Sequence, residues 1–226
     1  MSANRNVVTF ASNYGNQYAH FDGIDVTLDA RLRRIVLQGG VSVGQTMTDH
    51  CDLVDSLPEV LLGLNGVGPA GGGVWTPAEY CRQESGFVPQ YKGLWSYQLP
   101  WWGIRTSGTI QSIPGPLVQA NVIYTGAQVL AANPQLGAFS AGAVGQASIN
   151  VFEPGHRYGD RLNQLDLRFT KIVRMGRSAL DLNVDLYNAL NSDAIITQTA
   201  QYGTTWLRPT AVIQARFVKF SARIDF

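Results

Sequence analysis

The residues with the clearest potential for proton transfer or metal binding are His20, His50 and His156. Their spacing matches none of the patterns that bring zinc ligands together. The glycine run at residues 71–73 lacks the Lys-Ser/Thr pair that completes a phosphate-binding loop, so we interpret it as an ordinary loop. No serine lies in a nucleophile elbow. We therefore expect no enzyme activity, no metal centre formed by these residues and no cofactor.

Two cysteines, Cys51 and Cys81, lie in a region that is also rich in Asp, Gly and Pro. They would form a disulfide in an oxidising compartment and remain thiols in the cytosol. Asp49, Asp52 and Asp55 surround the first cysteine, and carboxylate oxygens are the ligands that Ca²⁺ prefers. The region between residues 47 and 88 is therefore either a calcium site or, as we favour, a solvated acidic loop.

Composition excludes several classes of protein. The net charge of +1 removes the electrostatic reason to expect a nucleic-acid partner. Charged residues make up 15% of the chain, below the roughly 25% typical of soluble domains. No apolar stretch approaches the about 18 residues of a transmembrane helix. The N-terminal residues also lack a signal peptide, which at face value indicates the cytoplasm.

Apolar and polar residues alternate with a period of two along seven segments, which is typical of β-strands. These segments cover residues 24–32, 35–46, 89–99, 102–111, 165–170, 180–187 and 217–226. An eighth strand within residues 5–12 would be short. The pattern predicts an all-β fold, an antiparallel meander of about seven to eight strands.

The connections between these segments alternate between short and long. Short connections lie at 33–34, 100–101 and 174–177, and long loops at 47–88, 114–160 and 191–210. Outer-membrane β-barrels show this asymmetry, with short periplasmic turns and long extracellular loops. If Phe226 lies at the periplasmic end, every short turn lies there too. We therefore predict transmembrane strands of a partial barrel, with a soluble β-sandwich as the alternative.

Aromatic and basic side chains gather where such strands would meet lipid headgroups. The aromatic ones are Trp101, Trp102, Trp206 and Phe226, and the arginines at short turns are Arg33, Arg34, Arg174 and Arg177. Lys171 is the one charge on an otherwise lipid-facing set of side chains, and it is near enough to a turn to reach the headgroups.

The polar faces of the last three strands could pair their charges. Aligning the last two as a hairpin that sets Asp181 opposite Arg223 also sets Asp185 opposite Lys219. The strand before them would then bring Arg168 beside Asn183, between the two aspartates. Opposite charges on neighbouring strands favour one register. We interpret this ladder as the wall of a polar lumen, or alternatively as a solvated sheet face with chance complementarity.

The C-terminal strand resembles the signal by which the outer-membrane assembly machinery accepts barrel proteins. The residues that match this pattern are Lys219, Ser221, Ile224 and Phe226. The small position is usually Gly, so Ser221 departs mildly from it.

Three further segments resemble TonB-dependent outer-membrane receptors, especially those that carry an N-terminal carboxypeptidase-regulatory-like domain. These segments are Asp185–Asn191, Gln111–Pro116 and Tyr158–Arg161. As an ensemble, the resemblance covers most of residues 14–226. Full members of this family also have a signal peptide, a TonB box, a plug domain and about 22 strands. In this sequence we recognise seven strands and none of the N-terminal parts.

The resemblance implies that residues 1–226 form a single C-terminal segment of a larger barrel, whose Met1 is not the true start. Its role would be uptake of a scarce, unidentified ligand across the outer membrane, and the segment would not function alone. The implied partners are outer-membrane lipid and lipopolysaccharide, the assembly machinery, a plug domain and TonB. Cell-surface placement also favours a disulfide between Cys51 and Cys81. The alternatives are a small outer-membrane adhesin or structural barrel and a soluble binding module.

Overall fold

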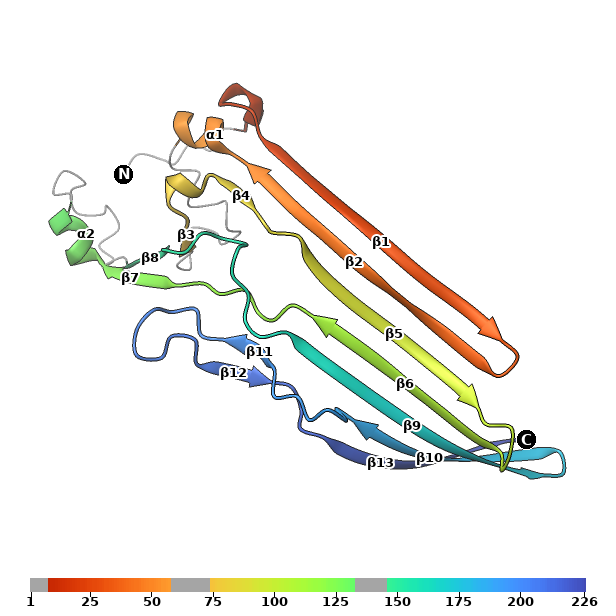
Figure 1. Cartoon of the computed structure of the whole chain (residues 1–226). Coiled ribbons are helices and arrows are strands. Elements are labelled where there is room, and N and C mark those ends of the chain that lie inside the picture. Colours follow the sequence, from red (N-terminus) through yellow and green to blue (C-terminus); the bar gives the residue numbers. More distant parts are fainter. Residues whose placement is uncertain (1–7, 58–73, 133–145) are drawn as a thin grey trace.

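The computed structural model describes residues 8–57, 74–132 and 146–226, and its main feature is one long antiparallel sheet (Figure 1). The sheet has eight strands, and the seven long ones follow the order β1-β2-β5-β6-β9-β10-β13. Their bounds are β1 Tyr18–Leu32, β2 Ile35–Asp49, β5 Val88–Gln98, β6 Ile104–Ile113, β9 Leu162–Met175, β10 Ser178–Tyr187 and β13 Phe217–Asp225. Long strands that follow one another along the chain therefore also lie side by side in the sheet, as the meander prediction required.

All seven predicted strands are present, and β1, β2 and β9 are longer than predicted. β1 begins at Tyr18 and β2 continues to Asp49. The predicted eighth strand within residues 5–12 is wrong for its described part, because residues 8–10 have no regular structure and Ala11–Asn13 form a 3-10 turn (η1). Its other residues lie outside the described part. The eighth strand of the sheet is instead β4 (Arg82–Glu84), which pairs with the end of β2.

The long connections contain secondary structure that alternation did not predict. They hold α1 Cys51–Ser56, β3 Val74–Trp75, η3 Ala78–Tyr80, β7 Asn121–Thr125, α2 Gly126–Ala132, β8 Gln146–Asn150, β11 Ile195–Gln198 and β12 Pro209–Val212. β3, β8 and β7 form a small sheet, and β11 pairs with β12. Long loops must pair their own backbone groups, and these small sheets do so. The glycine run 71–73 lies outside the described residues.

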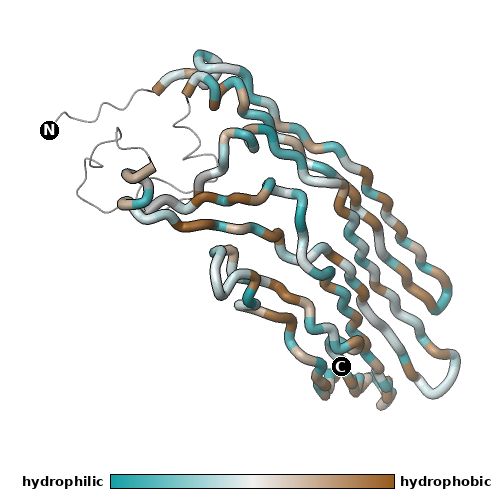
Figure 2. The backbone as a smooth tube through the Cα atoms, turned by 60° about the vertical axis from the view of Figure 1, so that its left-hand side comes forward, coloured by the Kyte–Doolittle hydropathy of each residue, from teal (hydrophilic) through white to brown (hydrophobic). Residues whose placement is uncertain are grey.

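The register gives the main sheet two chemically different faces. Residues directly opposite each other in an antiparallel ladder share a face. One row is polar and consists of Thr27, Gly40, Lys92, Gln111 and Gln164, whereas the next row is apolar and consists of Leu28, Gly39, Gly93, Ile110 and Leu165. Figure 2 shows the resulting alternation of hydrophilic and hydrophobic residues along the strands. We call the two sides the polar face and the apolar face.

The apolar face is not covered by a second layer within the described residues. The buried hydrophobic residues of that part of the chain are Leu53, Val54, Ala120 and Ala194, all outside the seven long strands. On the sheet itself, Ile24 is 71% exposed and Phe220 is 75% exposed. No helix in the described ranges is both long and apolar enough to span a bilayer.

The two ends of the sheet differ as the connection lengths predicted. The short turns between β1 and β2, β5 and β6, and β9 and β10 lie at one end, together with the C-terminus (Figure 1). The long connections lie at the other end. We call these the turn end and the loop end. At the turn end Trp102 has a φ of +62° and Gly103 a φ of +59°, which lets the chain reverse within a few residues.

Candidate functional site

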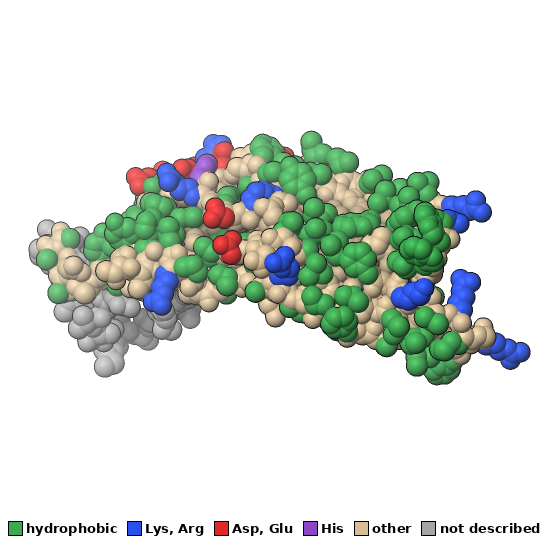
Figure 3. All heavy atoms as spheres, turned by 60° about the horizontal axis from the view of Figure 1, so that its bottom comes forward, with side chains coloured by type: hydrophobic (Ala, Val, Ile, Leu, Met, Phe, Trp, Pro, Cys, Tyr) green, Lys and Arg blue, Asp and Glu red, His purple; other side chains and the backbone are tan. Residues whose placement is uncertain are grey.

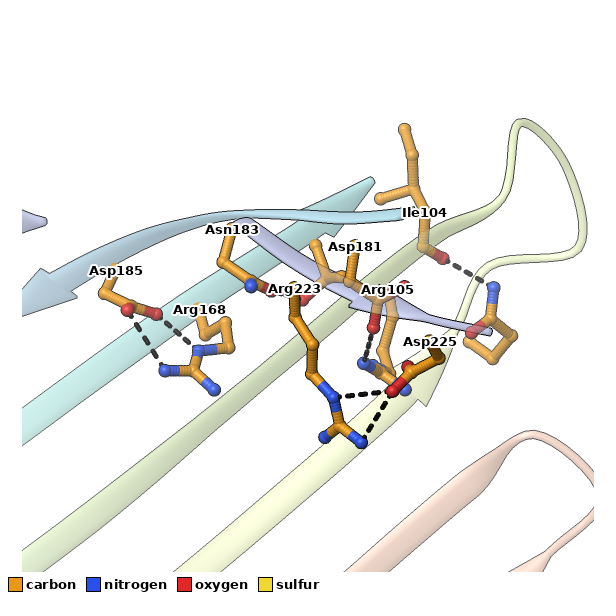
Figure 4. A network of polar contacts seen from close by, with 10 residues as sticks. Ile104, Arg105, Arg168, Asp181, Asn183, Asp185, Arg223 and Asp225 are labelled. Atoms are coloured by element: carbon orange, nitrogen blue, oxygen red, sulfur yellow. Dashed lines mark hydrogen bonds and ion pairs between the residues drawn. The ribbon is translucent and has the colours of Figure 1, made fainter. Parts of the chain in front are cut away.

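A ladder of charged side chains follows the polar face of β6, β9, β10 and β13 (Figure 4). Arg168 donates two hydrogen bonds to Asp185, and the one from Nη2 to Oδ2 measures 3.0 Å. The Asp185 side chain is only 3% exposed, whereas that of Arg168 is 49% exposed. The guanidinium therefore neutralises a carboxylate that has almost no access to solvent.

The register between β10 and β13 is the one that charge pairing predicted. Asp181 lies opposite Arg223, and Asp185 lies opposite Lys219. Neither pair forms an ion pair, because Arg223 instead binds Asp225 at 2.9 Å and Asp185 binds Arg168. Lys219 has no ion-pair partner among residues 8–57, 74–132 and 146–226.

The predicted neighbour of Arg168 was wrong by two residues. Arg168 lies opposite Asp185, and Asn183 lies opposite Thr170, from whose hydroxyl it accepts a hydrogen bond of 2.7 Å. The reason is the turn between β9 and β10. Its hairpin closes with Met175 opposite Ser178, so every residue of β9 moves by two positions relative to β10 and keeps its face.

Arg105 belongs to this ladder, although sequence reasoning missed it. Its Nη2 atom lies 3.1 Å from Asp181 Oδ2. Arg105 is on β6 and Asp181 on β10, so the arginine spans β9, where its direct neighbour is the buried Thr170. The alternation in the sequence did place Arg105 on the polar face. Its partner could be found only from the register of three strands.

Along the rest of the polar face, amide side chains join the charged ones. Gln111 donates a 2.8 Å hydrogen bond to Gln164 on β6 and β9, and Gln38 donates a 3.0 Å bond to Asp29 on β2 and β1. A hollow of about 1040 Å³ lies over this region of β1, β2, β5, β6 and β9, and Lys92 contributes to its lining. The arrangement offers hydrogen bonds and opposite charges to a polar ligand or to water.

Two of the segments that resemble the receptor family contact each other at the loop end of the sheet. Arg161 donates hydrogen bonds to the carbonyl oxygen of Pro89 (2.7 Å) and to that of Ser112 (3.0 Å). Gly159 N donates to Pro116 O at 2.8 Å. A Cβ atom at Gly115 would lie 2.2 Å from the carbonyl oxygen of Asp160, so only glycine fits there. Together these contacts tie the ends of β5, β6 and β9.

The third segment forms the turn after β10, around Asn188. This side chain is buried, and its Nδ2 atom donates to Ser192 O (2.8 Å) and Gln214 O (2.9 Å). Its Oδ1 atom accepts from Ser192 N at 2.8 Å. The backbone φ is +48°, a conformation that Asn tolerates better than most residues. Asn188 therefore joins the chain after β10 to the segment that enters β13.

We expect Asn188→Ala to lower the free energy of unfolding by about 2 kcal/mol, since three hydrogen bonds are lost and the left-handed backbone is strained. Asn188→Gly is the matched control because it loses the same bonds but accepts the backbone conformation. Urea unfolding of refolded protein, followed by tryptophan fluorescence, measures both. An alanine variant as stable as the unchanged chain would contradict this role.

The apolar face has a shallow groove where glycines replace larger side chains. Gly39 and Gly93 lie opposite each other on β2 and β5. Around them is a groove of about 470 Å³, lined mainly by Val26, Leu28, Leu37, Val41, Trp95 and Ile110. Apart from Gln38, the residues that line it are glycine or apolar, so the groove fits an apolar chain.

The predicted aromatic and basic residues at short turns all lie at the turn end. Trp101 is 57% exposed and Trp102 72% exposed. Lys171, on the apolar face, donates a hydrogen bond to the carbonyl oxygen of Trp102, so its charge reaches this end of the strand as predicted. Arg33, Arg34, Arg174 and Arg177 are all exposed.

Trp206 lies at the loop end within an aromatic cluster. Its indole Nε1 donates to Gln119 O at 2.9 Å, and its ring contacts those of Phe152 and Tyr202, with centroids 5.6 and 5.4 Å apart. These contacts connect the second and third long loops.

Cys51 and Cys81 form a disulfide that closes part of the first long loop. The predicted aspartates nearby do not converge, and the described residues contain no group of three or more side chains that could hold a metal ion. Asp52 Oδ2 instead accepts a 3.1 Å hydrogen bond from Asn16 Nδ2, and Asp49 accepts one of 3.0 Å from Cys51 N. Asp52 therefore holds the loop to the segment before β1, whereas Asp49 caps the start of the loop locally.

Two groups beside the disulfide have shifted pKa values. Burial raises the pKa of Tyr80, and the nearby Glu79 and Glu153 raise it further. A hydrogen bond to Glu84 raises the pKa of Arg82, so both keep their ordinary protonation state throughout the physiological range.

The four residues of the predicted assembly signal lie on β13 or directly after it. Lys219 and Ser221 are on the polar face, Ile224 is 59% exposed on the apolar face, and Phe226 is fully exposed at the turn end. The chain matches no protein-family model, and no curated protein or solved structure matches it either. The function must therefore be inferred from the geometry and the motifs.

Proposed function

We propose that this chain provides membrane-spanning strands of an outer-membrane β-barrel, with the apolar face toward lipid and the polar face toward a water-filled lumen. The observation that carries this proposal is the exposure of apolar side chains along the whole sheet. On the edge strand β1, Ile24, Val26 and Leu28 are each at least 60% exposed. Such a surface is costly in water and favourable in hydrocarbon.

Strand length and connection asymmetry support the same proposal. The seven strands contain 9 to 15 residues each, and about 9–11 tilted residues cross a bilayer. Short turns at one end and long, structured loops at the other are typical of outer-membrane barrels. Exposed tryptophans and arginines at the turn end fit a headgroup layer. In this arrangement the turn end is periplasmic and the disulfide-closed loop lies outside the cell.

A soluble sandwich would bury one face of its sheet under a second sheet. In the described part of the chain, the small sheet β3-β8-β7 and the hairpin β11-β12 instead continue from the loop end (Figure 1). They leave the apolar face of the long strands open. The sandwich alternative therefore lacks the layer that it requires.

Within this proposal, we favour a TonB-dependent receptor as the larger protein, and uptake of a scarce ligand as its role. The support is that three segments singled out by resemblance each make specific contacts, through Arg161, Gly115 and Asn188. Reading the gene upstream of the first codon tests this part. An open frame that encodes a plug domain would support it, whereas a stop codon and a ribosome-binding site there would favour a small adhesin or structural barrel.

Vesicle flotation tests the membrane proposal itself. The full chain is diluted from urea into neutral phosphatidylcholine vesicles and centrifuged through a density gradient. We expect it to float with the vesicles and to gain a β-sheet circular dichroism signal. Recovery as a folded monomer in the lipid-free fraction would contradict the proposal.

A further inference from the structure

Charge is distributed unevenly along the molecule, and the turn end is basic. Four exposed arginines lie there, two on each of two turns: Arg33, Arg34, Arg174 and Arg177. None of the four forms an ion pair within the described ranges. The acidic residues nearest to them are already paired, Asp29 with Arg31 at 3.4 Å and Asp225 with Arg223 at 2.9 Å. In Figure 3 Lys and Arg side chains protrude from one end of the molecule, and the Asp and Glu side chains in view lie away from it.

The loop end has the opposite balance. Acidic side chains predominate there, as Asp22, Asp49, Asp52, Asp55, Glu79, Glu84, Glu153, Asp160 and Asp193 against Arg82, Arg157, Arg161, Arg208 and Arg216. A molecule whose overall net charge is only +1 therefore presents a concentrated positive charge at one end. We call the four exposed arginines at the turn end the basic collar. Their positive charge attracts anionic headgroups within about a Debye length.

The apolar groove lies within reach of this basic collar. Gly39 follows Arg34 by five residues along β2, which corresponds to roughly 17 Å of strand. The hydrocarbon of one leaflet is about 15 Å thick. A phospholipid whose phosphate contacts the arginines of the β1–β2 turn could therefore extend one acyl chain along β2 into the groove over Gly39 and Gly93.

We propose that the turn end binds an anionic phospholipid, with its phosphate at Arg33 and Arg34 and one acyl chain in the groove beside Trp95. This inference rests on the proposed membrane function and deepens it by naming a lipid class. Guanidinium groups match the phosphate in charge and in hydrogen-bonding geometry. The partner is a membrane phospholipid and not free phosphate, because the groove adds apolar contacts that an inorganic ion cannot use.

The test compares flotation of the full chain with neutral phosphatidylcholine vesicles and with vesicles that contain one quarter phosphatidylglycerol. We expect at least tenfold tighter binding to the anionic vesicles at low salt, since each arginine near such a surface contributes about fivefold. Arg33→Gln/Arg34→Gln should lose most of this preference. The control Arg157→Gln/Arg208→Gln removes the same amount of charge at the loop end and should keep the preference for anionic vesicles. Circular dichroism in the vesicles checks that each variant folds.

A second measurement locates the acyl chain. In a variant whose only tryptophan is Trp95, we expect brominated phosphatidylglycerol diluted into ordinary phosphatidylcholine to quench fluorescence more than the same fraction of brominated phosphatidylcholine. Arg33→Gln/Arg34→Gln should remove the difference. Equal binding to both vesicles, or equal quenching, would overturn the lipid site and leave the membrane proposal standing. Failure to float with either vesicle would overturn both.

Discussion

Replacing Cys51 and Cys81 by serine is expected to lower the free energy of unfolding by about 3–4 kcal/mol, because the cross-link closes a loop and so lowers the conformational entropy of the unfolded chain. The two cysteines are 30 residues apart in sequence. The bond also sits where the first long loop leaves the sheet, since His50 N donates to Cys81 O at 3.1 Å. Without the disulfide, this loop and β4 should separate from β2 more easily.

Two readouts check this prediction. Urea unfolding gives the change in midpoint, and limited proteolysis reports cleavage within residues 51–84. Reduction of the unchanged chain should reproduce the effect of the double substitution, and reductant should leave the Cys51→Ser/Cys81→Ser variant unaffected. If the variant unfolds at the same urea concentration as the oxidised chain, the disulfide does not stabilise the loop end.

Arg168→Leu is expected to destabilise the sheet by about 3 kcal/mol, and Asp185→Asn by only about 1 kcal/mol. The asymmetry follows from burial. The Asp185 side chain is 3% exposed and would be left as a buried, unpaired carboxylate, whereas the Arg168 side chain is 49% exposed and can be hydrated when its partner is neutral. Loss of its partner therefore costs more free energy for the short, poorly hydrated carboxylate than for the long, half-exposed guanidinium.

The order of the two effects is the decisive result. Urea unfolding of both single variants in the same vesicles measures it, and Arg168→Leu/Asp185→Leu adds the double-mutant cycle. We expect the double variant to be more stable than Arg168→Leu, because removing the carboxylate removes the unpaired charge. If Asp185→Asn proves the more damaging change, the carboxylate is not buried as the structure has it.

The sequence was most informative about the strands and their faces. A period of two identifies a half-buried strand regardless of its neighbours, so all seven long strands and both faces could be predicted. The β10–β13 register followed from Asp181 and Asp185 matching Arg223 and Lys219. A slip by one residue would have exchanged the two faces, so charge alone could exclude it.

What the sequence could not provide depends on turn geometry and on tertiary neighbours. The partner of Arg168 was misplaced because a hairpin closed at Met175 and Ser178 differs by two residues from one closed at 174 and 177, and both keep the charges on the polar face. Arg105 reaches over a whole strand to Asp181, which no pairwise alignment shows. The helices and small sheets of the long loops contain too few residues to show a recognisable period in the sequence.

The central claim is that the apolar face meets hydrocarbon, and the most direct measurement is depth-dependent quenching of two single-tryptophan variants. Trp95 lies on the apolar face of β5, and Trp206 belongs to the aromatic cluster at the loop end. After refolding into vesicles of brominated lipid, we predict that bromine deep in the acyl chain quenches Trp95 strongly and leaves Trp206 almost unchanged. If both tryptophans are quenched equally little at every depth, the apolar face does not lie in the bilayer and the proposed function is wrong.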